Sequence, residues 1–432
     1  MKLCMIGTGY VGLVSGACFA DLGNTVWCVD TDINKIEKLN NNEIPIYEPG
    51  LEELVIKNKN FGRLKFTTNL NLAIKNSDII FICVGTPISK KNKSADLSYV
   101  FRVASQISSN INKFKVIVTK STVPVMTGDK IEKIIMKKKR KTHFEVVSNP
   151  EFLREGEAIR DFKFPDRIVV GSNNKKVSKK LESLYEPLIK KGATFFSTNR
   201  RGAELIKYAS NAFLATKISY INEIANLCEK TGVNIEDISI GMGLDKRIGS
   251  RFLRAGPAYG GSCFPKDTRA IAVTGDLYKT NLSIIKSVVK SNEKRKILLI
   301  ERIKNILSRK IKKKKIAFLG VTFKPNTDDM RESLSLLMIP FLQKKGALIN
   351  YYDPSGEKKE FSNIKNINYC ENIYDACNKA DLIVIHTEWD EFKTIDFKKI
   401  SKSKKIKIFD LRNLYSPKSM KKKGLVYYSI GR

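Results

Sequence analysis

The first thirty residues contain the pattern that most restricts the fold. An apolar run at residues 3–6 leads into Gly7-Thr8-Gly9-Tyr10-Val11-Gly12, residues 13–22 can form a helix, and a second apolar run ends at Asp30. A glycine-rich turn between a strand and a helix, with a carboxylate at the tip of the next strand, is typical of a dinucleotide-binding unit. The glycines let backbone amides approach a pyrophosphate, and Asp30 accepts hydrogen bonds from a ribose diol. Because Asp30 repels a 2′-phosphate, we expect NAD rather than NADP. The alternative to a dinucleotide site is a tight turn between strand and helix, followed by a solvated aspartate.

Further apolar runs of strand length alternate with helical patterns. In the first half, strand-like runs lie at 79–84, 116–119, 144–147 and 167–170, with helical patterns at 97–110 and 175–189. Residues 201–229 form one long helical pattern that is apolar on almost every side, so we expect it to be buried between domains or between subunits. Strand-like runs return at 316–320, 349–352, 382–385 and 406–409.

This order predicts an α/β protein. We expect two Rossmann-like, doubly wound parallel-sheet domains joined by a long central helix and a helical middle domain. The predicted boundaries are 1–199 for the NAD-binding domain, 200–310 for the helical domain and 311–432 for the second sheet domain. The second sheet domain has Val321-Thr322-Phe323-Lys324-Pro325 where the first has its glycine pattern, so we expect it to bind a different nucleotide.

Length and composition exclude several classes of protein. The chain has 432 residues, of which 42% are hydrophobic, enough for two or three compact domains. Its apolar runs are far shorter than the roughly 20 residues that span a bilayer, and its N-terminus does not resemble a secretory signal. We therefore expect a cytoplasmic protein with no membrane partner. The eight cysteines show no C-x-x-C spacing and there are only two histidines, which argues against a disulfide framework and against a metal site.

The charge is unusual. There are 78 Lys and Arg residues against 44 Asp and Glu residues, giving a net charge of +34. One hypothesis is a basic nucleic-acid-binding protein built on an NAD fold. The lysine runs at 137–141, 312–315 and 421–423 lack the interleaved aromatic residues of a single-strand binding surface. We therefore interpret the excess as solvated surface, with no specific nucleic-acid partner, although a positive field helps to attract a polyanionic small molecule.

Polar residues four apart are candidates for chemistry, because this spacing places both on one face of a helix. The pairs are Glu151 with Glu155, Lys207 with Asn211, and Cys263 with Asp267. Lys207 lies in the long apolar helix, where an ammonium group needs a partner. The alternative for Lys207 is a structural pair with Glu204.

Cys263 differs from the other cysteines because it lies in a glycine-rich loop, before Phe264-Pro265-Lys266-Asp267. A nearby lysine and a helix start favour the thiolate, which is the nucleophilic form. The alternative is an incidental loop cysteine. Beside a nicotinamide, however, a thiolate can capture an aldehyde as a thiohemiacetal, whose oxidation gives a thioester that water cleaves.

Four motifs in order resemble the UDP-glucose 6-dehydrogenase family of nucleotide-sugar dehydrogenases, essentially from end to end. They are the glycine turn, Lys120-Ser121-Thr122-Val123-Pro124, the stretch 149–156 (NPEFLREG) and the loop 260–267 (GGSCFPKD). The resemblance implies a four-electron oxidation of the C6 hydroxyl of UDP-glucose to a carboxylate, with two NAD reduced per sugar. The same chemistry on GDP-mannose or a UDP-N-acetylhexosamine is the alternative. The resemblance also implies a homodimer, with the long apolar helix as its interface.

The resemblance assigns roles to residues of this chain. Cys263 is the nucleophile, Asp267 assists proton removal and hydrolysis through a water, and Lys207 stabilises the developing oxyanion. The catalytic set is completed by Asn211, Thr122 and Glu151. The cofactor-binding residues it implies are Gly7, Gly9, Tyr10, Val11, Gly12, Asp30, Lys35, Thr86, Thr122, Glu155, Lys266 and Arg331.

The substrate is expected to lie against the second sheet domain, with the loop 254–260 around sugar and phosphate. The implied substrate-binding residues are Glu151, Phe152, Leu153, Arg154, Lys207, Asn211, Arg247, Phe252, Arg254, Tyr259, Gly260, Phe323, Lys324 and Arg412. Arg247 matches a position that reaches a phosphate from the neighbouring subunit. The chain departs from the family pattern at Leu411 and Ala258, where the family usually has glycine.

Overall fold

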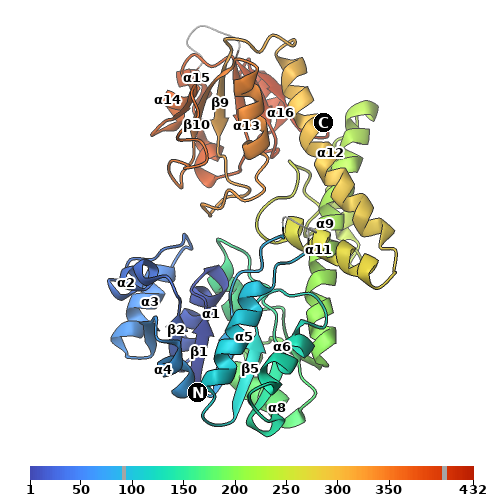
Figure 1. Cartoon of the computed structure of the whole chain (residues 1–432). Helices are drawn as coiled ribbons and strands as arrows, with labels where there is room; N and C mark the ends of the chain where they lie inside the picture. The colour runs from blue at the N-terminus through green and yellow to red at the C-terminus, as the bar shows by residue number, and fades with distance from the viewer. Residues whose placement is uncertain (90–93, 401–405) are drawn as a thin grey trace. The chain divides into compact units, whose positions relative to one another are not determined.

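The computed structural model describes residues 1–89, 94–400 and 406–432, which form two compact units (Figure 1). The first unit contains residues 1–210 and 273–278, and the second contains residues 211–272 and 279–432. Each unit is built around one sheet flanked by helices (Figure 1). The α/β class and the two sheet domains are therefore confirmed, whereas the boundaries at 199 and 310 stay a prediction.

The first unit contains an eight-stranded sheet of order β3-β2-β1-β4-β5-β6-β7-β8. Its neighbouring strands are parallel except β6 and β7, which pair antiparallel at Ser148 and Gly171. The strands are β1 (Lys2–Ile6), β2 (Thr25–Val29), β3 (Leu64–Thr67), β4 (Ile79–Ile82), β5 (Lys115–Thr119), β6 (Phe144–Ser148), β7 (Arg167–Gly171) and β8 (Thr194–Thr198). The strand order reverses between β1 and β4, and ligands of such sheets bind at the carboxyl ends of the strands at this point.

Helices cover both faces of this sheet, because the side chains that its strands direct to either face are apolar. Leu3, Met5 and Phe81 pack into one core with α1, and Cys4 and Ile80 pack into the other with α5. The helices of this unit are α1 (Tyr10–Asp21), α2 (Ile33–Asn40), α3 (Leu51–Asn60), α4 (Leu70–Lys75), α5 (Ser98–Asn110), α6 (Thr127–Met136), α7 (Ala158–Lys163) and α8 (Lys175–Ile189).

The helices of the middle region are α9 (Arg200–Thr231), α10 (Ile235–Leu244), α11 (Phe264–Leu277) and α12 (Ser283–Ile306). The long helix predicted at 201–229 is thus confirmed as α9. In the second unit α9 and α12 run side by side (Figure 1) and are joined by an ion pair between Glu229 and Arg302, with 2.7 Å between Oε1 and Nη1. One face of α9 is buried at Ala215, Ile221 and Ala225. The opposite face is exposed in the single chain, so the predicted burial of the whole helix is not seen within one chain.

The second unit contains a parallel six-stranded sheet of order β11-β10-β9-β12-β13-β14. Its strands are β9 (Lys315–Leu319), β10 (Leu348–Tyr352), β11 (Ile367–Tyr369), β12 (Leu382–Ile385), β13 (Lys407–Asp410) and β14 (Val426–Tyr428). The flanking helices are α13 (Ser335–Lys344), α14 (Ile373–Cys377), α15 (Phe397–Ile400) and α16 (Pro417–Lys422). The order reverses between β9 and β12, as it does between β1 and β4, so the two sheets repeat one plan.

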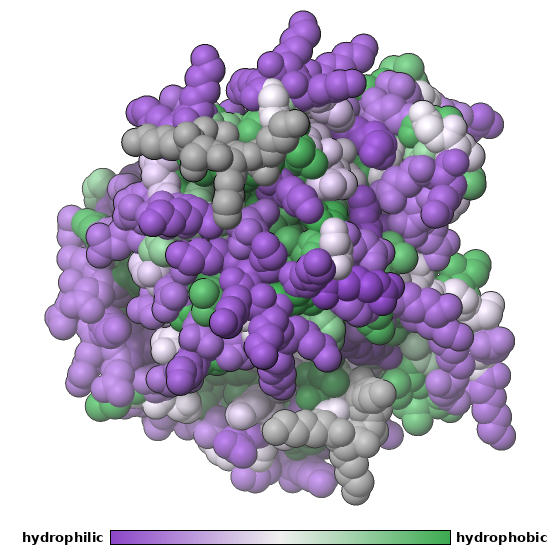
Figure 2. Space-filling model, turned by 90° about the horizontal axis from the view of Figure 1, so that it is seen from above, coloured by the Kyte–Doolittle hydropathy of each residue, from purple (hydrophilic) through white to green (hydrophobic). Residues whose placement is uncertain are grey.

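Hydrophilic side chains cover most of the face seen in Figure 2. The lysine runs belong to this kind of surface, since Lys137, Lys138, Lys312, Lys313 and the run 421–423 are exposed. Across the described ranges, no helix is both long enough and apolar enough to cross a membrane.

Candidate active site

The glycine turn of the first unit has the geometry that a pyrophosphate requires. Gly7 follows β1 with φ +101°, a conformation that favours glycine. A Cβ at Gly12 would lie 1.8 Å from the carbonyl oxygen of Gly7, so the turn and α1 can approach only without a side chain. A Cβ at Gly9, the N-cap of α1, would meet nothing within 4 Å. The turn therefore leaves open space beside the N-terminus of α1, where the helix dipole favours an anion.

Asp30 follows β2 and lies beside this turn. Its Oδ2 accepts hydrogen bonds from the backbone N–H and the hydroxyl of Thr8, both at 2.8 Å, and its Oδ1 accepts from the N–H of Asp32 at 3.2 Å. Burial disfavours the charged form, but these hydrogen bonds, with Lys35 Nζ 3.5 Å away, lower the pKa of Asp30. Asp30 is thus an ionised carboxylate, 15% exposed, suited to a ribose diol. The turn and Asp30 together fit NAD.

The carboxyl ends of β4 and β5 bring two predicted residues together. The Thr86 hydroxyl donates to the carbonyl oxygen of Thr122 at 3.0 Å, and both side chains are buried. Ser121 fixes the same turn by donating to the carbonyl oxygen of Val84 at 2.7 Å. Thr86 and Thr122 therefore lie together beyond the carboxyl ends of β4 and β5, which are neighbours in the first sheet.

Glu151 and Lys207 form a buried ion pair in the first unit. Lys207 Nζ lies 3.3 Å from Glu151 Oε1, and both side chains are 5% exposed. Glu151 Oε2 also accepts the N–H of Leu153 at 2.6 Å, and Lys207 Nζ lies 5.0 Å from the ring centre of Phe152. Charges buried to this degree need a partner or a function. The structure thus pairs two residues of the predicted catalytic set, although the sequence did not predict their ion pair.

Two predictions about this region are corrected. Glu151 and Glu155 do not share a helix face, because both precede α7 in a loop. Glu204, the predicted alternative partner of Lys207, accepts the backbone N–H groups of Met126 and Gly128 at 2.7 Å each, so it caps the start of α6.

The remaining predicted residues of this unit have clear contacts. The Tyr10 hydroxyl accepts the N–H of Gly156 at 2.6 Å, which ties α1 to the stretch 149–156. Arg154 is half-exposed and forms ion pairs with Asp161 and Glu157, so its guanidinium is bound within the protein. Val11 is partly exposed in the first turn of α1.

Sequence reasoning missed two buried groups that shape this site. Lys120 Nζ lies 3.1 Å from Asn149 Oδ1 and 3.2 Å from the Tyr185 hydroxyl, and thus joins the turn after β5 to the stretch carrying Glu151. Burial lowers the pKa of Lys120 to about 8. Glu48 accepts the N–H groups of Gly156 and Ala158 at 2.6 and 2.7 Å. These residues are far apart in sequence, so no local pattern reveals the contacts.

In the second unit, Cys263 directly precedes α11, and its carbonyl oxygen accepts the N–H of Asp267 at 2.8 Å. The spacing of four thus describes the first turn of a helix, and the thiol lies at the end where the dipole favours an anion. Asp267 is fully buried. It accepts a hydrogen bond from Asn211 Nδ2 at 2.6 Å and pairs with Lys266. Cys263, Asp267 and Asn211 are therefore brought together, and Lys266 is placed beside Asp267.

The loop before Cys263 packs on the second sheet. The N–H of Gly261 donates to the carbonyl oxygen of Arg331 at 2.8 Å, and a Cβ at Gly261 would lie 2.6 Å from the ring of Phe323. A Cβ at Gly260 would lie 2.6 Å from the carbonyl oxygen of Glu332. The thiol loop and the Phe323 loop therefore touch. Tyr259 and Phe252 pack edge-on against Phe264, with ring centres 6.3 and 6.0 Å apart.

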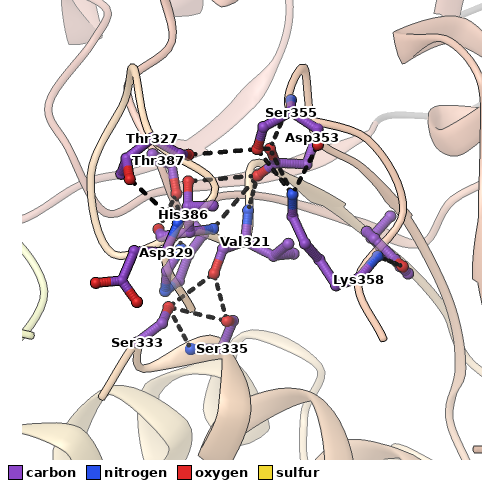
Figure 3. Close-up of polar contacts among 12 residues, drawn as sticks. Val321, Thr327, Asp329, Ser333, Ser335, Asp353, Ser355, Lys358, His386 and Thr387 are labelled. Atoms are coloured by element: carbon purple, nitrogen blue, oxygen red, sulfur yellow. Dashed lines mark hydrogen bonds and ion pairs between the residues drawn. The ribbon is translucent and has the colours of Figure 1, made fainter. Parts of the chain in front are cut away.

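The loop after β9 is held by buried polar side chains (Figure 3). Asp353 follows β10 as Asp30 follows β2, and its Oδ2 accepts the N–H of Val321 at 2.7 Å as Asp30 accepts that of Thr8. Unlike Asp30, Asp353 is fully buried, bonded to Ser355 and 3.7 Å from Lys358 Nζ. The aspartate that stays partly exposed beside the glycine turn in the first sheet thus has a buried counterpart, bound to other protein groups, in the second.

Four predicted arginines of this unit are bound by other protein groups. Arg412 donates to the carbonyl oxygen of Phe323 at 2.6 Å and pairs with Glu388, and Arg254 donates to the carbonyl oxygen of Arg412 at 2.9 Å. Arg331 pairs with Asp329, and Arg247, 89% exposed, pairs with Asp245. The Lys324 ammonium lies 5.8 Å from the ring centre of Phe323. Arg412 and Arg254 thus border the Phe323 loop, whereas the Arg247 side chain points into solvent.

Neither histidine lies with metal ligands: among the described residues no group of three His, Cys, Asp or Glu side chains could hold a metal ion. His386 is buried after β12, and burial, with Arg412 nearby, lowers its pKa to about 3, so the imidazole is neutral. All eight cysteines are free.

The fold and these contacts define a class of protein: an NAD-dependent oxidoreductase with one dinucleotide-binding sheet, a second sheet, and a cysteine loop before α11 that packs against the loop after β9. Three family models of this class match in order along the chain. They are the NAD binding domain, the central domain and the UDP binding domain of the UDP-glucose/GDP-mannose dehydrogenase family, at residues 1–189, 201–294 and 317–417. The chain belongs to this family of NAD-dependent nucleotide-sugar dehydrogenases.

Individual proteins similar to this chain are also named as nucleotide-sugar dehydrogenases. The chain is 48% identical to a UDP-glucose 6-dehydrogenase of Rhizobium meliloti, and the match covers all of both proteins. A solved UDP-glucose dehydrogenase from the archaeon Pyrobaculum islandicum is 34% identical over 99% of this chain and 96% of that one, with a TM-score of 0.90. A solved UDP-D-ManNAc dehydrogenase from Pyrococcus horikoshii is 26% identical over 100% and 99% of the two chains, with a TM-score of 0.88.

Proposed function

We propose that this protein oxidises UDP-glucose to UDP-glucuronate, reducing two NAD per sugar. The observation that carries the proposal is the thiol loop, in which Cys263 at the start of α11 and Asp267 with Asn211 lie next to the Phe323 loop of the second sheet. The choice of UDP-glucose over GDP-mannose or a UDP-N-acetylhexosamine is supported by the relatives, since the more similar ones carry the UDP-glucose name.

The chemistry divides among residues of the chain. The glycine turn and Asp30 would hold NAD, which would supply the hydride acceptor for both oxidations at C6. In the first, the C6 alcohol loses a hydride and a proton to become an aldehyde. The thiolate of Cys263 adds to the aldehyde carbon, and protonation of its oxygen gives a thiohemiacetal. The second oxidation gives a thioester, and water cleaves its carbon–sulfur bond to release the carboxylate and the thiol.

The polar partners have distinct tasks in this scheme. Lys207, which lies 3.3 Å from Glu151 Oε1, is assigned by the family resemblance to stabilise the alkoxide and the later oxyanion as a fixed cation. Asp267, held by Asn211, orients the water and accepts its proton. The family resemblance assigns Thr122 and Glu151 to the binding of a water or to proton transfer. Across the whole reaction one alcohol, one water and two NAD become one carboxylate, two NADH and three protons.

The stoichiometry tests the function. With limiting UDP-glucose and excess NAD we expect two NADH per sugar and UDP-glucuronate as the product, measured by absorbance and mass spectrometry. One NADH per sugar would contradict the proposal. A panel with GDP-mannose and UDP-N-acetylglucosamine, compared by kcat/KM, tests the sugar, and a larger kcat/KM for either would move the assignment to it.

Cys263→Ser tests the mechanism. The serine hydroxyl is far harder to ionise at neutral pH than a thiol, so we expect turnover to the acid to fall by at least about 10³-fold, a loss comparable to removing a nucleophile in other enzymes. Binding of UDP-glucose, measured by calorimetry, should persist. Cys370→Ser, a partly exposed cysteine of the second sheet domain, is the matched control, and unimpaired turnover in Cys263→Ser would remove the thiol from the mechanism.

We further propose a homodimer acting in the cytoplasm, and a division into domains at 1–199, 200–310 and 311–432. The dimer is supported by an apolar stripe on α9: Phe213, Tyr220 and Leu227 recur every seven residues and are 65%, 49% and 58% exposed. Contiguous apolar surface of this kind marks interaction sites. Free cysteines throughout are typical of a reducing compartment.

A further inference from the structure

The loop that leads to Cys263 is bound by buried polar side chains of α9 and α12 that neither the motifs nor the proposed chemistry uses. Asn222 on α9 and Asn292 and Arg295 on α12 are at most 5% exposed. Buried polar groups are costly to desolvate and are retained where they are fully hydrogen-bonded. Their partners are the backbone atoms of the segment Gly256–Tyr259.

The two asparagines each bind both kinds of backbone group. Asn222 Oδ1 accepts the N–H of Gly256 at 2.9 Å, and its Nδ2 donates to the carbonyl oxygen of Pro257 at 3.3 Å. Asn292 Oδ1 accepts the N–H of Tyr259 at 2.9 Å, and its Nδ2 donates to the carbonyl oxygen of the same residue at 3.1 Å. A side-chain amide that donates to one backbone group of the loop and accepts from another fixes which loop residue lies opposite it. Apolar packing does not select a residue in this way.

Arg295 supplies the third anchor. Its Nε and Nη2 donate to the carbonyl oxygen of Gly256 at 2.9 and 2.7 Å, and its Nη1 donates to the carbonyl oxygen of Asn222 and to Asn226 Oδ1 at 3.1 and 3.0 Å. Burial, with Arg302 nearby, lowers the pKa of Arg295 to about 10, so the guanidinium is still charged at neutral pH. A planar cation that bridges the loop and α9 orients both at once.

We propose that Asn222, Asn292 and Arg295 form a clamp that positions the substrate loop and, four residues after Tyr259, the nucleophile Cys263. They are positioning residues, because each acts through the backbone of the loop. This proposal rests on the proposed function in one respect only, which is the identity of the substrate as UDP-glucose. The purpose of the clamp is to hold the loop in the geometry that the reaction needs before the nucleotide sugar arrives, which reduces the entropy lost on binding.

The experiment compares two arginines of the same helix in the full-length protein. Arg295→Met removes the loop anchor. Arg302→Met removes the guanidinium that bonds Glu229 and the carbonyl oxygen of Ser429, and this contact does not involve the loop. Arg295→Lys keeps the charge but replaces the planar guanidinium by a single ammonium nitrogen. For each variant we measure the melting midpoint, the KM values for UDP-glucose and NAD, and the rate at which iodoacetamide alkylates Cys263, followed by mass spectrometry of its peptide.

We expect Arg295→Met to raise the KM for UDP-glucose about tenfold while the KM for NAD changes less than about twofold, because a misplaced loop weakens only the sugar nucleotide. In Arg295→Met the alkylation rate of Cys263 should change at least about threefold. Arg295→Lys should give values of KM and alkylation rate between those of the wild type and Arg295→Met. Arg302→Met should change neither the KM for UDP-glucose nor the alkylation rate. If Arg295→Met and Arg302→Met lower the melting midpoint alike and leave KM and alkylation unchanged, the clamp is merely structural and the proposal is wrong.

A second variant and a substrate-independent assay separate the possible outcomes. If Arg295→Met does not fold, Asn292→Ser, which removes the amide pair with Tyr259 but leaves Arg295, is compared with Arg302→Met by the same criteria. The alkylation assay needs no substrate. Failure of the wild-type protein to oxidise UDP-glucose would therefore overturn the proposed function, while unchanged alkylation in the variants would overturn the clamp.

Discussion

Asp30 shows how one carboxylate sets the choice of cofactor. It is ionised, held by Thr8, and still partly exposed beside the glycine turn. We expect Asp30→Ala to weaken NAD binding about tenfold, the loss of hydrogen bonds to a charged group. It should also improve kcat/KM for NADP relative to NAD, because the repulsion of a 2′-phosphate is removed. Unchanged cofactor preference in steady-state assays would mean that Asp30 is merely solvated.

Glu204 links pH to stability through a helix cap. Burial raises its pKa to about 7, although the N–H groups of Gly128 and Met126 and the charge of Arg200 favour its ionised form; Asp129 nearby opposes it. The unfolded carboxyl titrates near 4.5, so the folded state binds more protons between these values. This residue therefore contributes stability that is fully present below pH 4.5 and is lost as the pH rises through 7.

Glu204→Gln tests this directly, because glutamine resembles the protonated side chain and does not titrate. From pH 4.5 to 7.5 we expect the variant to become more stable relative to the wild type by on the order of 3 kcal/mol. The measurement is the difference in denaturant midpoint at matched pH values. A constant difference across that range would show that Glu204 titrates normally.

Single residues also show what a sequence can reveal. The glycine turn, Asp30, Lys207 and the thiol loop were all identifiable, because each is a short local pattern or a charge in an apolar stretch. Lys120, Glu48 and Asn292 were missed. Their meaning comes from contacts between segments 29 to 108 residues apart, which no periodicity encodes.

At the scale of elements, central strands were predicted well and edge strands poorly. Residues 79–82 are apolar throughout because β4 is covered on both faces, and they were predicted as a strand. β8 and β14 lie at sheet edges, and β14 has only three residues. β8 combines two phenylalanines with polar residues and is mostly exposed, and the apolar run of β14 is short and only partly buried. Neither strand was predicted.

The two sheets repeat one loop with different uses, and this gives a prediction for each. Asp353 binds the N–H groups of Val321 and Thr322 and faces the buried Lys358. Asp353→Asn leaves that ammonium without its carboxylate, so we expect a loss of about 3 kcal/mol. Asp30→Asn, at a partly exposed site, should cost about 1 kcal/mol. Thermal melting of the two variants compares them, and an equal shift would contradict the internal role of Asp353.

At the scale of the whole molecule, the exposed apolar surface points to a partner, whereas the excess of charge is explained by solvated surface. The lysine runs are largely solvent-exposed, as the charge pattern predicted. The predicted burial of α9 is met on one face only, because a single chain leaves the stripe of Phe213, Tyr220 and Leu227 uncovered. A second copy of the chain is the partner that an apolar, seven-residue stripe on a long helix favours.

Phe213→Glu tests that assembly. Burying an aromatic side chain contributes about 1.5–3 kcal/mol, and a carboxylate at the same position must also be desolvated. We therefore expect the dissociation constant of the dimer to rise at least about 100-fold, and light scattering after size exclusion to show a monomer at concentrations where the wild type is a dimer. Tyr374→Glu on α14, another exposed aromatic residue, is the control and should stay dimeric. A monomeric wild type, or a Phe213→Glu variant as dimeric as the control, would place the interface elsewhere.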